Sequence, residues 1–162
     1  MKKLLTLLLV LPIWVGCNQK DDPVSRSKEF THTGCSSLLA TRAGSDDGGR
    51  SLLTLKYEDG DLRVIRTNAM MNCSIKDHGM VCEATIEGKV IHYSVTETDG
   101  PTANCMCRVK EMSSVVTGLK VGKEYTFDYF CSRGYDPFTF VFKEGMVMIQ
   151  DLDPHYWLSG NN

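Results

Sequence analysis

Seven cysteines are the residues of this 162-residue chain with the widest range of possible chemistry. A cysteine acts as a nucleophile or a metal ligand as a free thiolate, and as a cross-link once it is oxidised. The compartment decides between these roles, because disulfides persist only in an oxidising environment. The seven are Cys17, Cys35, Cys73, Cys82, Cys105, Cys107 and Cys131.

The closely spaced pair Cys105 and Cys107 is a candidate for binding a metal ion. Thiolate and thioether sulfurs together suit Cu(I), and four methionines lie near the pair or upstream of it. These methionines are Met70, Met71, Met80 and Met106. No histidine stands at ligand spacing from the pair, however, and the chain has no CxxC…CxxC pattern for zinc. We therefore predict no metal and no cofactor, and keep a redox or copper-binding protein built on Cys105-x-Cys107 as the alternative.

The histidines and acidic residues do not form a recognisable catalytic motif. Asp151 and Asp153 stand two apart and would share a face of a strand. A pair of catalytic carboxylates also needs a cleft that shifts one pKa, so a solvated strand end is the favoured interpretation. The four histidines are His32, His78, His92 and His155. We predict that the protein is not an enzyme.

The first segment has the layout of a secretory signal. Lys2 and Lys3 precede an apolar run from Leu4 to Val15. A membrane-spanning helix needs about 20 apolar residues, so this run is too short to be one. A basic start followed by a short apolar core is typical of a cleaved signal peptide. We assign residues 1–16 to it.

The sequence Trp14-Val15-Gly16-Cys17 resembles the bacterial lipobox, with Trp14 where that motif usually has Leu. The resemblance implies that Cys17 is lipidated and becomes the first residue of the mature protein. Residues Asn18–Asp22 resemble the lipoprotein export signal of the Bacteroidetes, which implies the outer face of the outer membrane. The alternatives are ordinary cleavage and a plain solvated linker. We expect residues 17–30 to be a flexible tether, with the membrane bound through the lipid on Cys17.

Export also predicts disulfides. Lipidation of Cys17 leaves six cysteines, enough for three bridges. Cys105 and Cys107 would point to one face of a strand, so a bond between them is disfavoured. Cys73 and Cys82 flank a turn and are the preferred partners for that pair. Six cysteines allow many pairings, and the remaining pairing stays open.

The charge of the chain argues against nucleic acid as a partner. It has 18 basic and 20 acidic residues, and removal of Lys2 and Lys3 leaves 16 against 20. No cluster of basic residues exceeds a pair, whereas phosphate binding requires a basic stripe. We therefore predict no nucleic-acid partner.

Alternating apolar residues predict a succession of short strands. Residues Ser51–Asn68 read as a hairpin around the turn pair Asp59-Gly60, and a looser region follows from Met70 to Met80. Spacings of roughly ten residues favour an all-β sandwich or barrel, and we predict an antiparallel sandwich of about 7–8 strands. We place it in residues 31–155, with a tail at 156–162. The one helical candidate is Ser36–Arg42. The further alternating segments are 82–86, 91–95, 105–109, 125–131, 138–142 and 146–150.

The stretch from Leu119 to Tyr125 resembles the fibronectin III corner Leu-x-Pro-Gly-x-x-Tyr, with Gly122 in place and Val121 where the family has Pro. The resemblance implies an immunoglobulin- or fibronectin III-like sandwich, in which the Tyr125 hydroxyl bonds back to the backbone near Leu119 and fixes the crossing between the two sheets. A plain hairpin connection is the alternative.

Residues from Leu53 to Asp153 resemble a family of small Bacteroidales lipoproteins of unknown function. The resemblance rests on Asn72-Cys73, on Cys105-x-Cys107 and on the corner stretch that starts at Gly118. It implies no activity. We predict a surface-anchored, non-catalytic binding module for a glycan or for an envelope or host protein, because rigid scaffolds present loops for recognition. The candidate contact residues are Arg133, Tyr135, Phe138 and Trp157.

Overall fold

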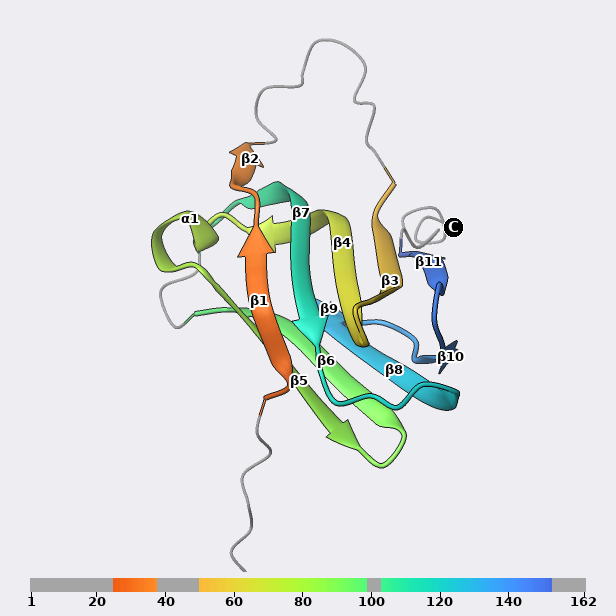
Figure 1. The fold of residues 1–162 in the computed structure, drawn as a ribbon. Helices are drawn as coiled ribbons and strands as arrows, with labels where there is room; N and C mark the ends of the chain where they lie inside the picture. The colour runs from red at the N-terminus through yellow and green to blue at the C-terminus, as the bar shows by residue number, and fades with distance from the viewer. Residues whose placement is uncertain (1–24, 38–49, 99–102, 153–162) are drawn as a thin grey trace, which may run out of the picture.

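A computed structural model describes residues 25–37, 50–98 and 103–152 of the chain (Figure 1). The predicted signal peptide, Cys17 and Trp157 lie outside the described residues. The described part consists of strands and one short helix, α1 (Ile75–His78). The strands are β1 (Ser27–His32), β2 (Cys35–Ser37), β3 (Leu52–Glu58), β4 (Asp61–Asn72), β5 (Met80–Glu87), β6 (Val90–Glu97), β7 (Met106–Val116), β8 (Lys123–Cys131), β9 (Arg133–Gly134), β10 (Phe138–Phe142) and β11 (Val147–Asp151).

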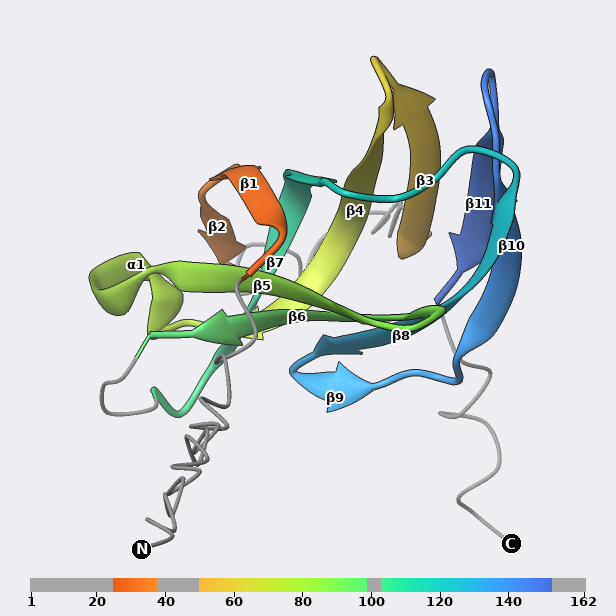
Figure 2. The same cartoon turned by 60° about the horizontal axis from the view of Figure 1, so that its bottom comes forward.

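The strands form two sheets that pack against each other, as Figures 1 and 2 show from two directions. One sheet has the order β1-β7-β4-β3-β11, with β2 also paired to β7. The other has the order β10-β8-β6-β5, with β9 paired to β8. We call them the β7 sheet and the β8 sheet. The predicted all-β sandwich is confirmed.

The β3–β4 hairpin forms where the sequence predicts it. Asp59 and Gly60 both have positive φ, 51° and 93°, and Glu58 pairs with Asp61. Positive φ at both central residues is the geometry that hairpin turns favour. β4 continues to Asn72, because it pairs with β7 over its whole length. Part of the region expected to be loose is therefore strand.

Two boundaries differ from the prediction. Ser36 does not start a helix, because β2 pairs with β7 and places Ser36 opposite Arg108. β1 begins at Ser27, inside the predicted tether. Most of its side chains are exposed and only Phe30 is apolar, so the strand has little hydrophobic alternation to reveal it.

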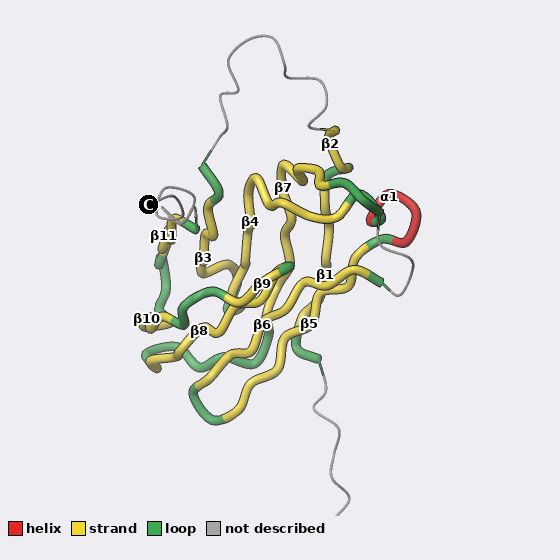
Figure 3. The backbone as a smooth tube through the Cα atoms, turned by 180° about the vertical axis from the view of Figure 1, so that it is seen from behind, coloured by secondary structure: helices red, strands yellow, loops and turns green. Residues whose placement is uncertain are grey.

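One strand pair is parallel, unlike the fully antiparallel arrangement that the sequence predicts. β6 and β8 run side by side in the same direction. Between them the chain crosses to the other sheet as β7, so it returns to the β8 sheet in its original direction (Figure 3). Parallel neighbours require such a crossover connection.

The core lies between the inner faces of the two sheets. Phe127 and Tyr129 of β8 and Phe142 of β10 are almost fully buried, opposite aliphatic side chains such as Leu55 and Val64 of the β7 sheet. Burying one such side chain stabilises the fold by roughly 1.5–3 kcal/mol. The alternation of buried and exposed residues along each strand matches this arrangement.

The hydrogen bond that the corner resemblance implies for Tyr125 is present. Tyr125 is buried, and its hydroxyl oxygen accepts a hydrogen bond of 2.9 Å from the backbone N–H of Lys120, next to Leu119. Gly122 has φ +79°, and its N–H donates to the carbonyl oxygen of Phe142 at 2.7 Å. The corner therefore ties the segment before β8 to the end of β10.

Two disulfides join the start of β7 to its neighbours. Cys107 is bonded to Cys35 of β2, and Cys105 is bonded to Cys73, with Cα–Cα distances of 5.7 and 5.6 Å. The expectation that Cys105 and Cys107 reach two different partners is confirmed, as is Cys73 as one of them. Cys82 as the other partner is wrong.

The predicted third disulfide is also wrong, because Cys82 and Cys131 are both free. The strand register explains why. Cys82 pairs with Val95 on one side, and Val95 pairs with Cys131 on the other. Two strand spacings separate the cysteines by roughly 9–10 Å, whereas a disulfide requires Cα atoms within about 7 Å.

Both thiols lie against the core. Cys131 is 3% exposed, and its Sγ lies 3.4 Å from Sδ of Met71. Burial raises the pKa of Cys131, which keeps the unreactive thiol form. Sγ of Cys82 lies 3.1 Å from Oγ of Ser27.

A thiol count tests this assignment. We expect a Cys17→Ser chain to offer two thiols to a maleimide after unfolding in guanidinium, because four cysteines are in bridges. In the native protein Cys131 should stay unlabelled, since its side chain is buried. Mass spectrometry measures both, and an unfolded chain without free thiols would show that a third bridge exists.

Reduction of the same protein should lower its melting temperature. The bridges span 72 and 32 residues, and each stabilises the fold by roughly 2–4 kcal/mol, mainly by restricting the unfolded chain. An unchanged melt after complete reduction contradicts a fold held by these bridges.

The corner gives a second test. Tyr125→Phe removes the hydroxyl that accepts from Lys120 and should lower the free energy of unfolding by about 1–3 kcal/mol. Urea denaturation measures the change. Tyr57→Phe is the matched control, because its hydroxyl has no hydrogen bond with any described residue. Equal losses in both variants would remove the corner bond as the cause.

Candidate functional site

Three of the predicted contact residues lie between the end of β8 and the start of β10: Arg133 opens β9, Tyr135 follows that strand, and Phe138 opens β10. Tyr135 stacks on Tyr129 with ring centroids 5.1 Å apart, and Phe138 packs 5.7 Å from Phe127. Tyr135 and Phe138 are half-buried, so both rings anchor the turn to the core. Arg133 is exposed, with its guanidinium carbon 5.0 Å from the centre of the Tyr135 ring. Of the three, Arg133 is the one that faces solvent.

His92 lies on the outer face of the β8 sheet between two carboxylates. Its Nδ1 is 2.9 Å from Oδ2 of Asp128, and its Nε2 is 3.9 Å from Oε2 of Glu87. All three side chains are substantially exposed. The register places His92 directly opposite Asp128, so strand pairing builds this contact.

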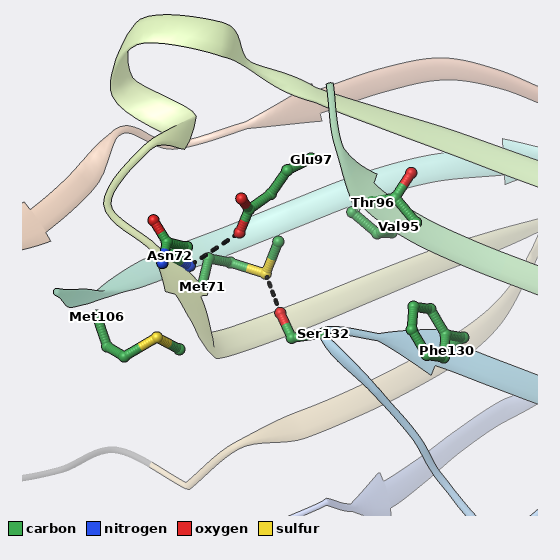
Figure 4. Close-up of a pocket in the computed structure, with 8 residues that line it drawn as sticks. All are labelled: Met71, Asn72, Val95, Thr96, Glu97, Met106, Phe130 and Ser132. Carbon is green, nitrogen blue, oxygen red and sulfur yellow. Dashed lines mark hydrogen bonds between the residues drawn. The ribbon is translucent and has the colours of Figure 1, made fainter. Parts of the chain in front are cut away.

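Two cavities, of about 340 and 160 Å³, share the side chain of Phe130. The smaller is lined by residues of the β8 sheet, whereas residues of β4 and β7 also line the larger. Phe130 is 44% exposed. We call the two cavities together the Phe130 groove. The larger is lined by Met71, Asn72, Val95, Thr96, Glu97, Met106, Phe130 and Ser132 (Figure 4). The smaller is lined by Glu83, Thr85, His92, Tyr93, Ser94, Asp128 and Phe130.

Hydrogen bonds fix the rim of the larger cavity. Oε1 of Glu97 accepts from the backbone N–H of Asn72 at 3.0 Å, and Oε2 accepts from the Ser74 hydroxyl at 2.7 Å (Figure 4 shows the first bond). The Asn72 side chain bonds to the backbone of Ala103 through both its amide nitrogen and its oxygen. The Cys73–Cys105 bridge is adjacent, so this rim is preorganised.

The electrostatics of the groove are acidic. Carboxylates of Glu83, Glu97 and Asp128 line it, and His92 is the one basic side chain among the lining residues. A site lined by one sign of charge repels ligands of the same sign. The groove therefore disfavours phosphate-rich or sulfated polymers.

Beneath the smaller cavity lies a closed polar contact. Oη of Tyr93 is 2.7 Å from Oγ of Ser114, which is fully buried. Burial raises the pKa of Tyr93 well above its ordinary value, with a further contribution from the neighbouring Cys82. The hydroxyl is neutral and engaged, so it positions the sheet and is not a proton donor for the groove.

Sequence reasoning did not identify the groove. The signal in the sequence is Phe130 itself, because Phe130 shares the polar side of β8 with Thr126 and Asp128. An aromatic residue on the polar face of a strand is an exposed apolar group that invites a functional explanation. The contribution of Asn72 and Met106 depends on the β4–β7 register, which the sequence does not specify.

The residues proposed for copper do not form a thiolate site. Cys105 and Cys107 are both in disulfides, which removes the thiolates that the alternative needs. Met71 and Met80 are buried in the core, whereas Met70 is on the opposite, exposed side of β4. Within the described ranges, no three His, Cys, Asp or Glu side chains gather as a metal site.

In the portion of the chain that the structure describes, no helix has the length and apolarity needed to cross a membrane. Comparisons of the chain with protein-family models, with curated proteins and with solved structures each found no match.

Proposed function

We propose that this chain is a non-catalytic binding module, anchored to the outer membrane through a lipid on Cys17, that holds a segment of a neutral glycan in the Phe130 groove. The observation that carries the proposal is the pair of cavities that meet at one exposed aromatic ring. Binding sites are typically concave and combine apolar surface with a few fixed polar groups.

The composition of the groove suits a sugar. The flat face of Phe130 offers apolar surface to the C–H groups of a pyranose ring, and the carboxylates, hydroxyls and amide around it can bond to sugar hydroxyls. Glu97 and Asn72 are already held in place, so little ordering is needed on binding. The acidic lining favours an uncharged or cationic ligand over a polyanion.

A protein partner fits these features less well. A stable protein interface buries about 800 Å² on each partner around an apolar centre. The two cavities are small, about 340 and 160 Å³, and carboxylates such as Glu97 and Asp128 lie among their apolar lining residues. We therefore expect oligosaccharides to bind in preference to proteins. If an envelope or host protein binds instead, the glycan proposal is wrong and a protein is the partner.

The anchor follows from the lipobox resemblance and from chain length. Lipid chains hold a protein stably at a membrane when two or more are attached. Seven residues lie between Cys17 and Ser25, and a fully extended segment joining the two reaches at most roughly 30 Å. The module would therefore stay close to the membrane surface.

The groove is tested by removing its aromatic ring. A glycan array identifies the neutral oligosaccharides that bind, and calorimetry measures their affinity. Phe130→Ala should weaken this affinity by about tenfold or more, because an anchoring aromatic side chain contributes on the order of 1–2 kcal/mol to binding. Val141→Ala is the matched control, since Val141 is 47% exposed on β10 outside the groove. Equal affinities of the two variants would exclude the groove as the site.

The anchor is tested in the cell. We expect the full-length chain to fractionate with the outer membrane and a Cys17→Ser variant to be released in soluble form, because the lipid attaches to that sulfur. Intact mass measures the acyl chains on the mature protein. A soluble wild-type protein whose mass shows no lipid would overturn this part of the proposal while leaving the groove untouched.

A further inference from the structure

An arginine lies inside the sandwich. Arg66 of β4 shares the inner face of its strand with Leu62 and Val64 and is 4% exposed. The guanidinium group stays protonated in proteins, so this side chain brings a full positive charge into the core. Burying such a charge without a partner costs several kcal/mol.

The contacts of Arg66 do not compensate its charge. Nη1 donates to the carbonyl oxygen of Thr67 and Nη2 to the hydroxyl of Tyr135, both at the long distance of 3.4 Å. The guanidinium carbon also lies 5.7 Å from the centre of the Tyr135 ring. Nε has no partner, and no carboxylate of the described residues lies within 4 Å.

A second buried polar group lies in the same place. Tyr129 is 1% exposed, and the neighbour of its hydroxyl is the thiol of Cys131, a weak hydrogen-bonding group, with no stronger partner among the described residues. Its ring stacks on Tyr135, the residue that contacts Arg66, and the guanidinium charge acts on its hydroxyl. Burial raises the pKa of Tyr129 and of Cys131, so neither neighbour supplies a negative charge. Buried polar groups that lack partners are rare, so the unpaired Nε of Arg66 calls for an explanation.

The surface above this cluster carries a second guanidinium group, that of Arg133. Tyr135 is half-buried and lies between the interior and the exposed Arg133, whose guanidinium carbon is 5.0 Å from the ring centre. Two guanidinium groups therefore contact one tyrosine, one from inside and one from the solvent side. A shift of the Tyr135 side chain would open the inner group to a ligand.

We infer that Arg66 binds a carboxylate group of a small ligand at the end of the sandwich, beside Tyr135. The carboxylate pairs side-on with Nε and Nη2, which displaces the long bond to the Tyr135 hydroxyl, and it accepts a hydrogen bond from Tyr129. The planar guanidinium fork matches a carboxylate in this bidentate way. Arg133 attracts the anion at the mouth. This inference does not depend on the Phe130 groove.

The experiment titrates the full chain with sodium acetate over about 1–100 mM, the range expected for so small a ligand. Sodium chloride at equal ionic strength and acetamide, which has the same shape without the charge, are the controls. Acetate should raise the melting temperature by about 5 °C over chloride and should shift the Nε–H resonance of Arg66. Acetamide should do neither.

Arg66→Met distinguishes binding from a merely structural role. We expect this variant to melt at or above the wild-type temperature in chloride, because it replaces an uncompensated buried charge with an apolar side chain. It should show no response to acetate. An equal acetate response in wild type and variant would overturn the inference.

Should Arg66→Met fail to fold, the resonance of wild-type Arg66 decides the matter, and no shift with acetate overturns the inference. Arg133→Ala, at an exposed position, should weaken the acetate response about threefold or more. An unchanged response would overturn its place at the mouth.

Discussion

The pairing of β4 with β7 is the interaction on which the rest of the structure depends. It runs from Leu62 opposite Val116 to Asn72 opposite Met106 and joins the longest strands of the fold. β7 also holds β1 and β2 on its other side, and the bridged residues Cys105 and Cys107 lie just before it and near its start. One register thus places Asn72 at the groove and Arg66, opposite Met112, in the interior.

The two sheets fit because their inner faces are complementary in size. The β8 sheet contributes large rings such as Tyr93, Phe127 and Tyr129, whereas β7 contributes the small side chain of Ser114 opposite Tyr93. A small residue facing a large one lets layers interlock at the density of a protein interior. The hydroxyl of Ser114 also satisfies that of Tyr93, so this polar pair is buried without an unpaired group.

The sequence allows most of the strands to be predicted, because apolar alternation has the period of a strand with one buried face. It does not allow the register to be predicted, and the cysteines show the consequence. The expectation of three bridges rests on an even number of cysteines. In the structure, Val95 lies between Cys82 and Cys131 in the sheet, so these two cysteines are too far apart to bond. β1 is missed because its contribution is backbone pairing, which leaves little trace in side-chain type.

The two candidate sites differ in how visible they are in the sequence. Arg66 occupies an apolar-period position after Leu62 and Val64, so the alternation itself assigns it to the inner face. Whether a charge at such a position is buried depends on what covers it, here Tyr135 from a turn almost seventy residues later. Arg133 and Tyr135, two of the predicted contact residues, lie against each other here, and Tyr135 packs against the core.

The end of β8 supplies residues to both places because side chains alternate along a strand. Tyr129 and Cys131 point inward, whereas Phe130 and Ser132 face the groove. Ser132 has φ +57°, a conformation that few residues other than glycine adopt, and it reverses the chain into β9.

Met71 joins the two sides. Its sulfur lies 3.4 Å from Sγ of Cys131 and 3.3 Å from Oγ of Ser132. A change at this strand end therefore perturbs the groove and the interior together, since packed side chains transmit displacement. A control variant for either site therefore has to lie on another strand, as Val141 does on β10. A loss of binding caused by substitution of Ser132 or Cys131 would not separate one site from the other.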